Sequence, residues 1–301
     1  MSAVSDTDTT APVPAPDTLA GLLDVLDLMP CPDVGPDAFL GQSQPQPWGR
    51  VFGGQVLAQA LIAAQRTVEA ERPVHSMHGY FLRAGDSNEA ISFTVDRLRD
   101  GRSFSARRVQ ASQFGRPILS MIASFQVPGG GIDHAAPMPD VPPPDALPSL
   151  HERFGDTPAT EQVRYWLRQR PVDLRHVQTP VHVEGAERGS SQAVWMRAVA
   201  PLPDDPALHA AVLAYASDYT ILEPALRAHG LTWSEPGMRV ASLDHALWWH
   251  RPVRCDDWLL YVQESPSASG ARALSLGRLY ARDGALVASV AQEGMIRIPS
   301  S

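Results

Sequence analysis

The sequence predicts an α+β protein in which one unit, a long buried helix followed by antiparallel strands, occurs twice. The main observation is an internal repeat. Strand-like segments of the second half match those of the first at an offset of 168 residues, which pairs Arg83 with Arg251 and Phe93 with Tyr261 over about 45 residues without a gap. A connector with seven prolines from Pro128 to Pro148 separates the halves. Because proline cannot join a central strand or a helix interior, this connector marks a boundary.

The helix of the first half is expected at residues 52–70 (FGGQVLAQALIAAQRTVEA). This segment is rich in alanine and almost uncharged, and a helix that is apolar on nearly every face has to be buried on nearly every face. A sheet wrapped around the helix provides that burial. Residues 218–230 (DYTILEPALRAHG) are the counterpart in the second half at an offset of 165, which pairs Gly53 with Asp218. Asp218 precedes an apolar run there, so it is also a candidate N-cap.

Strands are expected where β-branched, aromatic and other apolar residues recur between turn residues. They fall at 74–83, 90–99, 104–114 and 118–127 in the first half, and at 240–252, 258–265, 271–282 and 286–296 in the second. We therefore divide the chain into a disordered tail (1–18), a first unit (19–127), a Pro/Gly-rich linker (128–150) and a second unit (151–301).

Composition argues against several classes of function. The chain has 301 residues and a net charge of −8, and no basic stripe or tail suggests binding to nucleic acid. Two cysteines are too few for a disulfide framework, and no run approaches the ~18 apolar residues of a membrane span. The simplest expectation is a soluble cytoplasmic protein. The pairs His75/His78 and His245/His250 have odd spacings, which point the two side chains to opposite faces of a strand, so no metal site is expected.

Several segments resemble the acyl-CoA thioesterase II family, whose members hydrolyse fatty acyl-CoA. They are VFGGQVLAQAL (51–61), HSMHGYFLRAGD (75–86) and LRDGRSFSARRV (98–109) in the first half, and ASDYTILEPAL (216–226), ASLDHALWWHRP (241–252) and VASVAQEG (287–294) in the second. The resemblance implies a double hotdog, that is, two repeats of a long buried helix wrapped by an antiparallel sheet. It also implies an acyl-CoA substrate, no cofactor, and assembly into homodimers or homotetramers.

The same resemblance implies three catalytic residues in the second unit: Asp218 of the A-S-D motif, Ser242 before L-D-H, and Gln292 of A-Q-E-G. Some relatives have Thr where this chain has Ser242, but either hydroxyl supplies one donor and two acceptor sites. We expect Asp218 to accept a proton from a water that Ser242 and Gln292 hold in place. Backbone N–H groups at the N-terminus of the second-half helix would stabilise the oxyanion, and no acyl-enzyme forms.

Four further residues are expected at the substrate site. They are His75, Gly53, Gly54 and Tyr219. The repeat adds that the first half lacks a site of its own, because Gln292 corresponds to Ser124 at offset 168 and Asp218 corresponds to Gly53 at offset 165. One competent site per chain is therefore expected, with the first half supplying pocket wall and packing.

Two other functions stay open. A non-catalytic acyl-CoA-binding or lipid-binding protein could use the same fold, although its sequence should have lost part of the catalytic set, which is complete here. The segment RAGDSNEAIS (83–92) is similar to a hydratase signature of other hotdog proteins but lacks the histidine. Arg83, Arg102, Arg251 and Arg254 are candidates for contacts with CoA phosphates, against the commoner role of solvated surface charge.

Overall fold

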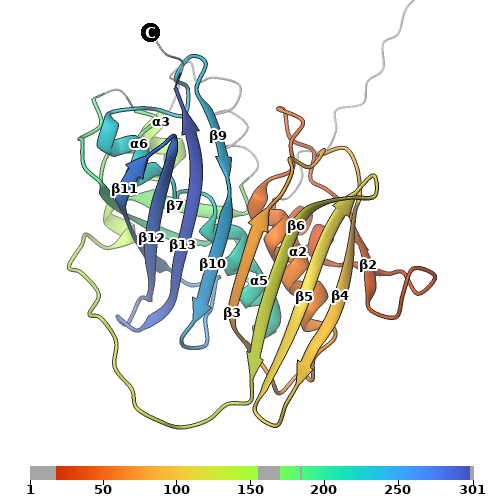
Figure 1. Ribbon diagram of the computed structural model, residues 1–301. Helices are drawn as coiled ribbons and strands as arrows, with labels where there is room; N and C mark the ends of the chain where they lie inside the picture. Colours follow the sequence, from red (N-terminus) through yellow and green to blue (C-terminus); the bar gives the residue numbers. More distant parts are fainter. Residues whose placement is uncertain (1–17, 155–169, 184, 299–301) are drawn as a thin grey trace, which may run out of the picture.

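The computed structural model describes residues 18–154, 170–183 and 185–298 (Figure 1). Nearly all of the predicted N-terminal tail lies outside these residues, and Thr18 already begins a helix. The described residues of the first half form two helices and six strands: α1 (Thr18–Leu26), β1 (Met29–Pro30), β2 (Ala38–Gly41), α2 (Gly53–Gln65), β3 (Val74–Phe81), β4 (Ile91–Asp100), β5 (Phe104–Gln113) and β6 (Arg116–Gln126).

The Pro-rich connector leaves β6 as an extended loop that crosses to the second half (Figure 1). It ends in the short helices η1 (Pro144–Ala146) and α3 (Leu150–Phe154). The described elements that follow are β7 (Val172–His176), β8 (Ser191–Ala198), α5 (Pro206–Ser217), α6 (Glu223–His229), β9 (Arg239–Ser242), β10 (Asp244–Trp249), β11 (Leu259–Ser269), β12 (Arg272–Ala281) and β13 (Leu286–Arg297). The exact domain boundaries stay a prediction.

The helical part of the second half differs from the expectation. Residues 218–222 form turns, and only α6 is helical within the predicted 218–230 segment. A longer helix, α5, precedes it, with Asp205 as its N-cap and Pro206 in its first turn. Asp218 is the C-cap of α5, so its interpretation as an N-cap is wrong. The break between α5 and α6 directs the Asp218 side chain towards the first half.

One continuous antiparallel sheet joins the two halves, in the order β1-β2-β4-β5-β6-β3-β10-β13-β12-β11-β8-β7, with β9 beside β13. The halves meet at the pair β3–β10, where His78 lies opposite Ala246, Tyr80 opposite Asp244 and Ser76 opposite Trp248. Because Ala246 is also the repeat partner of His78, the register is symmetric about this pair. The strand order β4-β5-β6-β3 recurs as β11-β12-β13-β10, which confirms the double hotdog.

The strand pairing shows that the offset between the two halves changes by one residue in the last strand of the repeat. His78 pairs with Ile122 in the first half, and Ala246 pairs with Ala291 in the second, so β13 follows β6 at an offset of 169. The extra residue lies in the β12–β13 turn: two residues separate the paired Gln113 and Arg116 in the first half, whereas three separate Ala281 from Ala285, its hydrogen-bond partner in the second. The structural counterpart of Gln292 is therefore Ala123 rather than Ser124.

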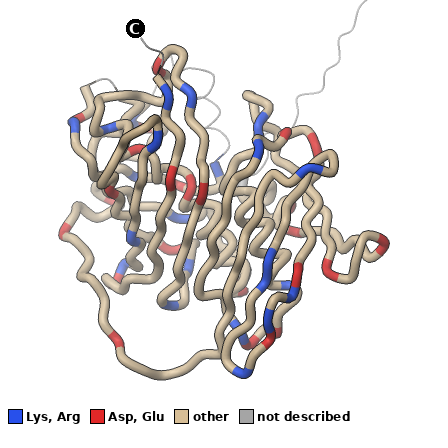
Figure 2. The backbone as a smooth tube through the Cα atoms, in the orientation of Figure 1, with Lys and Arg blue, Asp and Glu red and all other residues tan. Residues whose placement is uncertain are grey.

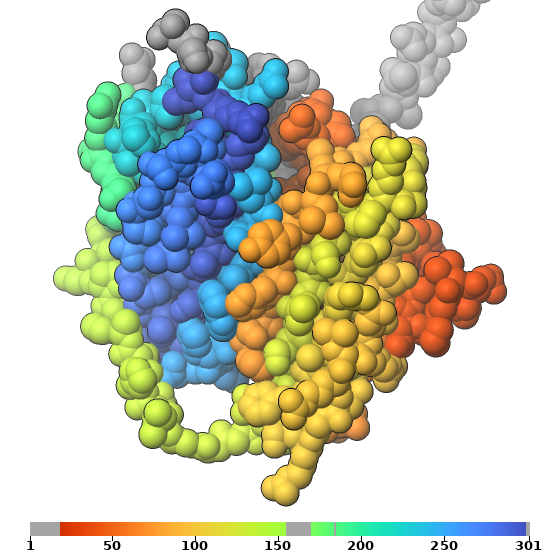
Figure 3. Space-filling model, in the orientation of Figure 1, coloured from red at the N-terminus to blue at the C-terminus, as the bar shows by residue number. Residues whose placement is uncertain are grey.

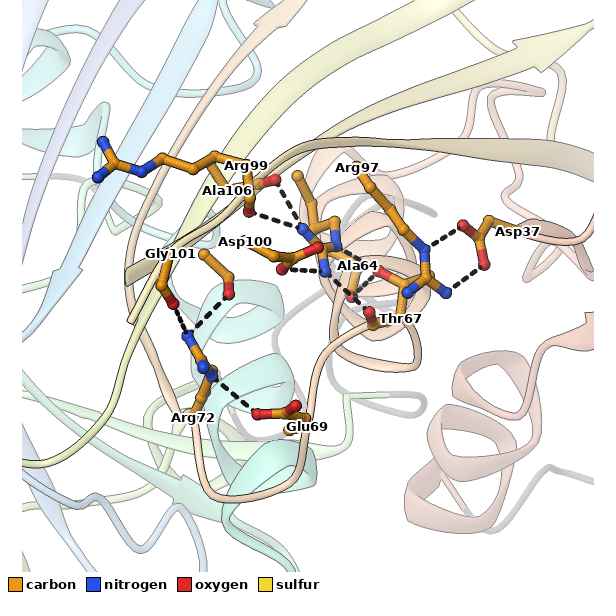
Figure 4. A network of polar contacts seen from close by, with 12 residues as sticks. Asp37, Ala64, Thr67, Glu69, Arg72, Arg97, Arg99, Asp100, Gly101 and Ala106 are labelled. Carbon is orange, nitrogen blue, oxygen red and sulfur yellow. Dashed lines mark hydrogen bonds and ion pairs between the residues drawn. The ribbon is translucent and has the colours of Figure 1, made fainter. Parts of the chain in front are cut away.

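Helix α2 is buried along its length, as its composition predicts, between the first-half strands and α5 (Figure 1). A polar network holds its C-terminal end to the β4–β5 hairpin (Figure 4). Arg107, which is 1% exposed, donates hydrogen bonds to the Thr67 hydroxyl and carbonyl after α2 and to the Asp100 carboxylate. Its neighbour Arg108 is exposed and pairs with Asp96. This anchor fixes where the opposite, N-terminal end of α2 lies.

Candidate active site

A cavity of about 1230 Å³ opens between the two halves, and Figure 3 shows the surface hollowed there. Its walls come from both halves of the chain. The first half supplies the loop before α2, the start of α2 and the residues after β3, while the second supplies the end of α5, β9 and β13. All three predicted catalytic residues, Asp218, Ser242 and Gln292, line this cavity. The fold thus brings together side chains that are 24 to 74 positions apart in the sequence.

Asp218 faces the N-terminus of α2. A Cβ placed on Gly53 would lie 2.8 Å from Asp218 Oδ2, and the backbone N–H of Gly54 hydrogen-bonds to the carboxyl group. The N-cap residue Phe52 has no side-chain group that caps this end of α2, so its first N–H groups are available to Asp218 or to a ligand. The helix start at the site therefore belongs to the first half, which corrects the expectation that the second-half helix provides it.

Gln292 connects the other two side chains. It lies on β13, is 1% exposed, and its Nε2 donates a hydrogen bond of 2.9 Å to Ser242 Oγ. Ser242 ends β9, opposite Gly294 of β13. Both Gln292 and Ser242 also hydrogen-bond to Asp218. The three groups form one connected cluster at the cavity wall.

The carboxyl group of Asp218 has a perturbed pKa. Burial raises this pKa from 3.8 to about 6, while hydrogen bonds from Gln292, Gly54 and Ser242 act in the opposite direction. The effect of burial on the pKa is the larger one because none of the three donors carries a full positive charge. A carboxylate with this pKa is mostly ionised at neutral pH, yet is basic enough to accept a proton from water.

Of the four predicted substrate-site residues, three lie at the cavity or directly behind its wall, and His75 does not. Gly53 and Tyr219 line the cavity, and Gly54 lies directly behind Gly53, where any Cβ would come within 2.3 Å of the Tyr215 carbonyl oxygen. The Tyr219 ring stacks on Phe52 at a centroid distance of 5.0 Å. His75 does not line the cavity: its ring hydrogen-bonds to Ser124 at 2.8 Å and packs edge-on against Phe104.

Arginines surround the cavity, and among its described lining residues Asp218 is the one carboxylate. Five arginines contribute, namely Arg50, Arg83, Arg170, Arg239 and Arg297. Figure 2 shows basic positions near the upper ends of both halves. Within the part of the chain that the structure describes, no carboxylate approaches Arg50, Arg83, Arg239 or Arg297 closely enough for an ion pair, whereas Arg251 and Arg254 pair with aspartates elsewhere. The cavity of this acidic protein is locally cationic.

Sequence reasoning missed two features of the site. The sequence suggests His245 only as a possible metal ligand, but this side chain is fully buried and hydrogen-bonds to Gln292. Of the cavity arginines, sequence reasoning named Arg83 only. No group of three or more His, Cys, Asp or Glu in the described ranges is arranged to hold a metal ion. No helix among the described residues is long and apolar enough to cross a membrane.

Comparisons with known proteins agree across nearly the whole chain. A family profile described as acyl-CoA thioesterase matches residues 165–295, and one described as the acyl-CoA thioesterase N-terminal domain matches residues 44–126. Human acyl-coenzyme A thioesterase 8 is 38% identical, with 91% of this chain and 88% of the human chain covered. Acyl-CoA thioesterase 2 of Haemophilus influenzae is 36% identical, covering 93% and 98%. The crystal structure of acyl-CoA thioesterase II TesB2 from Mycobacterium marinum, 43% identical, superposes with a TM-score of 0.76 over 93% of this chain and 99% of that one.

Proposed function

Because this chain belongs to the acyl-CoA thioesterase II family and hydrolyses acyl-CoA thioesters, we propose that Asp218, Ser242 and Gln292 carry out the reaction on a single water molecule. The observation that supports this most strongly is the connected cluster of a carboxylate, a hydroxyl and an amide at the wall of the cavity between the two halves. Each group has a separate role in the attack on the thioester.

Asp218 acts as the general base. As it takes a proton from the water, the water oxygen bonds to the thioester carbonyl carbon and the carbonyl electrons move onto oxygen. The tetrahedral intermediate then collapses, the C–S bond breaks, and the CoA thiolate leaves and receives the proton from Asp218. The products are a free acid and CoA, and no bond to the enzyme forms. General-base help of this kind contributes about 10²–10⁴ to the rate.

Ser242 and Gln292 hold the attacking water. The two N–H groups of Gln292 point towards Ser242 and Asp218, and a water that enters between Gln292 and Asp218 takes the second N–H as its donor. The Ser242 hydroxyl, which already accepts from Gln292, keeps one acceptor site for a water proton. A water fixed in this way loses little entropy on reaching the transition state. The oxyanion is stabilised by backbone N–H at the start of α2, where Gly53 allows close approach and the helix dipole favours negative charge.

The cationic cavity supports a polyanionic substrate. Acyl-CoA carries phosphate groups at one end and an apolar chain at the other, and arginine is the side chain best suited to bind phosphate. We assign the phosphate-bearing end to the exposed arginines, among them Arg239 and Arg297, and the acyl chain to the aromatic wall of Phe52, Tyr215 and Tyr219. A fatty acyl chain fits an apolar wall of this kind.

One site per chain follows from the register. The strand positions that correspond to Ser242 and Gln292 in the first half are Val74 and Ala123, and neither side chain can hold or activate water. Gly53, the partner of Asp218 at the sequence offset of 165, has no side chain. The first half instead contributes the start of α2. A cytoplasmic homodimer or homotetramer remains our expectation for the assembled protein.

The test is thiol release from acyl-CoAs of short, medium and long chain. We expect Asp218→Asn and Gln292→Ala to lose at least about a hundredfold in kcat. Gln263→Ala is the matched control, since Gln263 is an equally buried glutamine that bonds to Thr220 away from the cavity, and it should keep most of the activity. Full hydrolysis by Asp218→Asn would overturn the assignment. Binding of acyl-CoA without hydrolysis by the native chain would instead favour the non-catalytic alternative.

A further inference from the structure

His245 lies directly behind the catalytic cluster. It belongs to β10 and is fully buried. Its Nδ1 hydrogen-bonds to Gln292 Oε1, and its Nε2 lies 3.0 Å from the hydroxyl of Ser217, the residue before Asp218. A chain of hydrogen bonds therefore runs from Ser217 through His245 and Gln292 to Ser242. His245 itself has no contact with the cavity.

The proton positions in this chain follow from the chemistry of the groups. A carbonyl oxygen only accepts, so the bond to Gln292 Oε1 needs a proton on His245 Nδ1. Burial lowers the pKa of His245 to about 4, so the ring is neutral at pH 7 and carries only this proton. Nε2 is then an acceptor, and in this tautomer the Ser217 hydroxyl, which lies 3.0 Å from both Nε2 and the Ala214 carbonyl oxygen, donates to Nε2. This tautomer holds Gln292 with its oxygen away from Asp218 and its NH₂ group towards Ser242 and Asp218.

The opposite amide orientation would damage the site. It would turn Gln292 Oε1 towards the Asp218 carboxylate, so that two acceptors face each other and the water loses a donor. An amide is nearly symmetric in shape, so packing alone does not select one orientation. The hydrogen bond from the His245 N–H selects the orientation with Oε1 towards the histidine.

The first half of the chain shows that the fold does not require a histidine here. The counterpart of His245 is Met77, and the counterpart of Gln292 is Ala123; both are fully buried in the same sheet positions. Burying polar groups costs free energy unless every one is paired, so two apolar residues are the simpler solution. The polar pair occurs only in the half that has Asp218.

We propose that His245 is a positioning residue for hydrolysis, which fixes the orientation of the Gln292 amide, and that Ser217 holds the required tautomer. The proposal rests on the proposed function, because it gives Gln292 a role at the reacting water. It adds a fourth and a fifth side chain to the machinery, and neither of them touches substrate.

Three substitutions of His245 separate this role from packing. His245→Met copies Met77 of the first half. His245→Asn keeps an N–H near the position of Nδ1, whereas His245→Gln carries its N–H further out, near Nε2 and Ser217. We expect kcat to fall about 10- to 100-fold in the Met and Gln variants and less than about fivefold in the Asn variant, with KM for acyl-CoA unchanged within about twofold. In the Met variant the acid limb of the pH profile should also move to higher pH, because hydrogen bonding from Gln292 lowers the pKa of Asp218.

The outcomes are distinguishable from failure of the proposed function. If Asp218→Asn and Gln292→Ala are inactive while His245→Met keeps full kcat, the positioning role is overturned and the three-residue site stands. Equal losses in the Asn and Gln variants would also overturn it, because packing and not the N–H would then matter. If His245→Met does not fold, the comparison of Asn with Gln decides alone. If Asp218→Asn is active, the proposed function itself fails, and the role of His245 loses its premise.

Discussion

Replacing Asp218 by Asn should make the protein inactive and, above pH 6, more stable. The carboxyl pKa is raised from 3.8 to about 6 because burial disfavours the charge. A group whose pKa is raised by folding contributes full stability below its unfolded pKa and loses that contribution as the pH rises through its folded pKa. A tenfold change in an equilibrium constant is about 1.4 kcal/mol. The raised pKa of Asp218 therefore lowers the free energy of unfolding by at most about 3 kcal/mol at pH 8 and by about 0.6 kcal/mol at pH 4.

The measurement is unfolding by urea or heat for the native protein and Asp218→Asn at pH 4, 5, 6 and 8. We expect the variant to gain several degrees in Tm at pH 8 and almost nothing at pH 4. Asp256→Asn is the control of opposite sign: burial opposes the charge there too, but hydrogen bonds from Arg254 and the Leu202 N–H keep the Asp256 pKa below its usual value. That variant should lose stability at pH 8. A stability difference for Asp218→Asn that does not change with pH would refute the argument that burial raises its pKa.

Three further predictions concern activity. The acid limb of kcat/KM should fall about tenfold per pH unit below an apparent pKa of about 6, because protonated Asp218 cannot accept a proton; a flat profile from pH 5 to 8 would contradict this. Gly53→Ala should lower kcat at least about tenfold without a large change in Tm, since its Cβ would lie 2.8 Å from Asp218 Oδ2 and displace the carboxylate from the water. Arg239→Gln combined with Arg297→Gln should raise KM about tenfold or more for acyl-CoA but not for acyl-pantetheine, which lacks the phosphates; an equal rise for both substrates would point to packing instead of charge.

The fold could be predicted largely because the repeat is visible in the sequence. Strand β5 (Phe104–Gln113) recurs 168 residues later as β12 (Arg272–Ala281) with identical bounds. The one-residue slip before β13 was not predictable, because it depends on how the hairpin turn closes. The sequence analysis does not place helix α5, although Asp205 and Pro206 are a typical start signal. Its alanine-rich run ends at Ala216, but apolar residues continue through Ile221 and Leu222, so sequence periodicity does not show the break.

The sequence predicts those residues of the candidate site that stand in recognisable local motifs, and it does not predict the others. Asp218, Ser242 and Gln292 each stand in a recognisable motif, and the structure brings all three to one cavity. His245 is the histidine of the L-D-H motif, but its contact with Gln292 depends on strand pairing, which the sequence does not specify residue by residue. The cavity arginines come from loops and strand ends far apart in the chain, so only the fold gathers them.

The most direct test of the mechanism is a single turnover of acyl-CoA in ¹⁸O-water with enzyme in excess, followed by acid quenching and mass spectrometry of enzyme and product. Direct attack by water predicts one ¹⁸O in every released acid, no label in the peptide that contains Asp218, and no enzyme species heavier by the mass of the acyl group. An acyl adduct on the peptide that contains Asp218, an unlabelled acid, or ¹⁸O in Asp218 would each show that the carboxylate attacks the thioester itself, and the account of Asp218 as a base acting on water would be wrong.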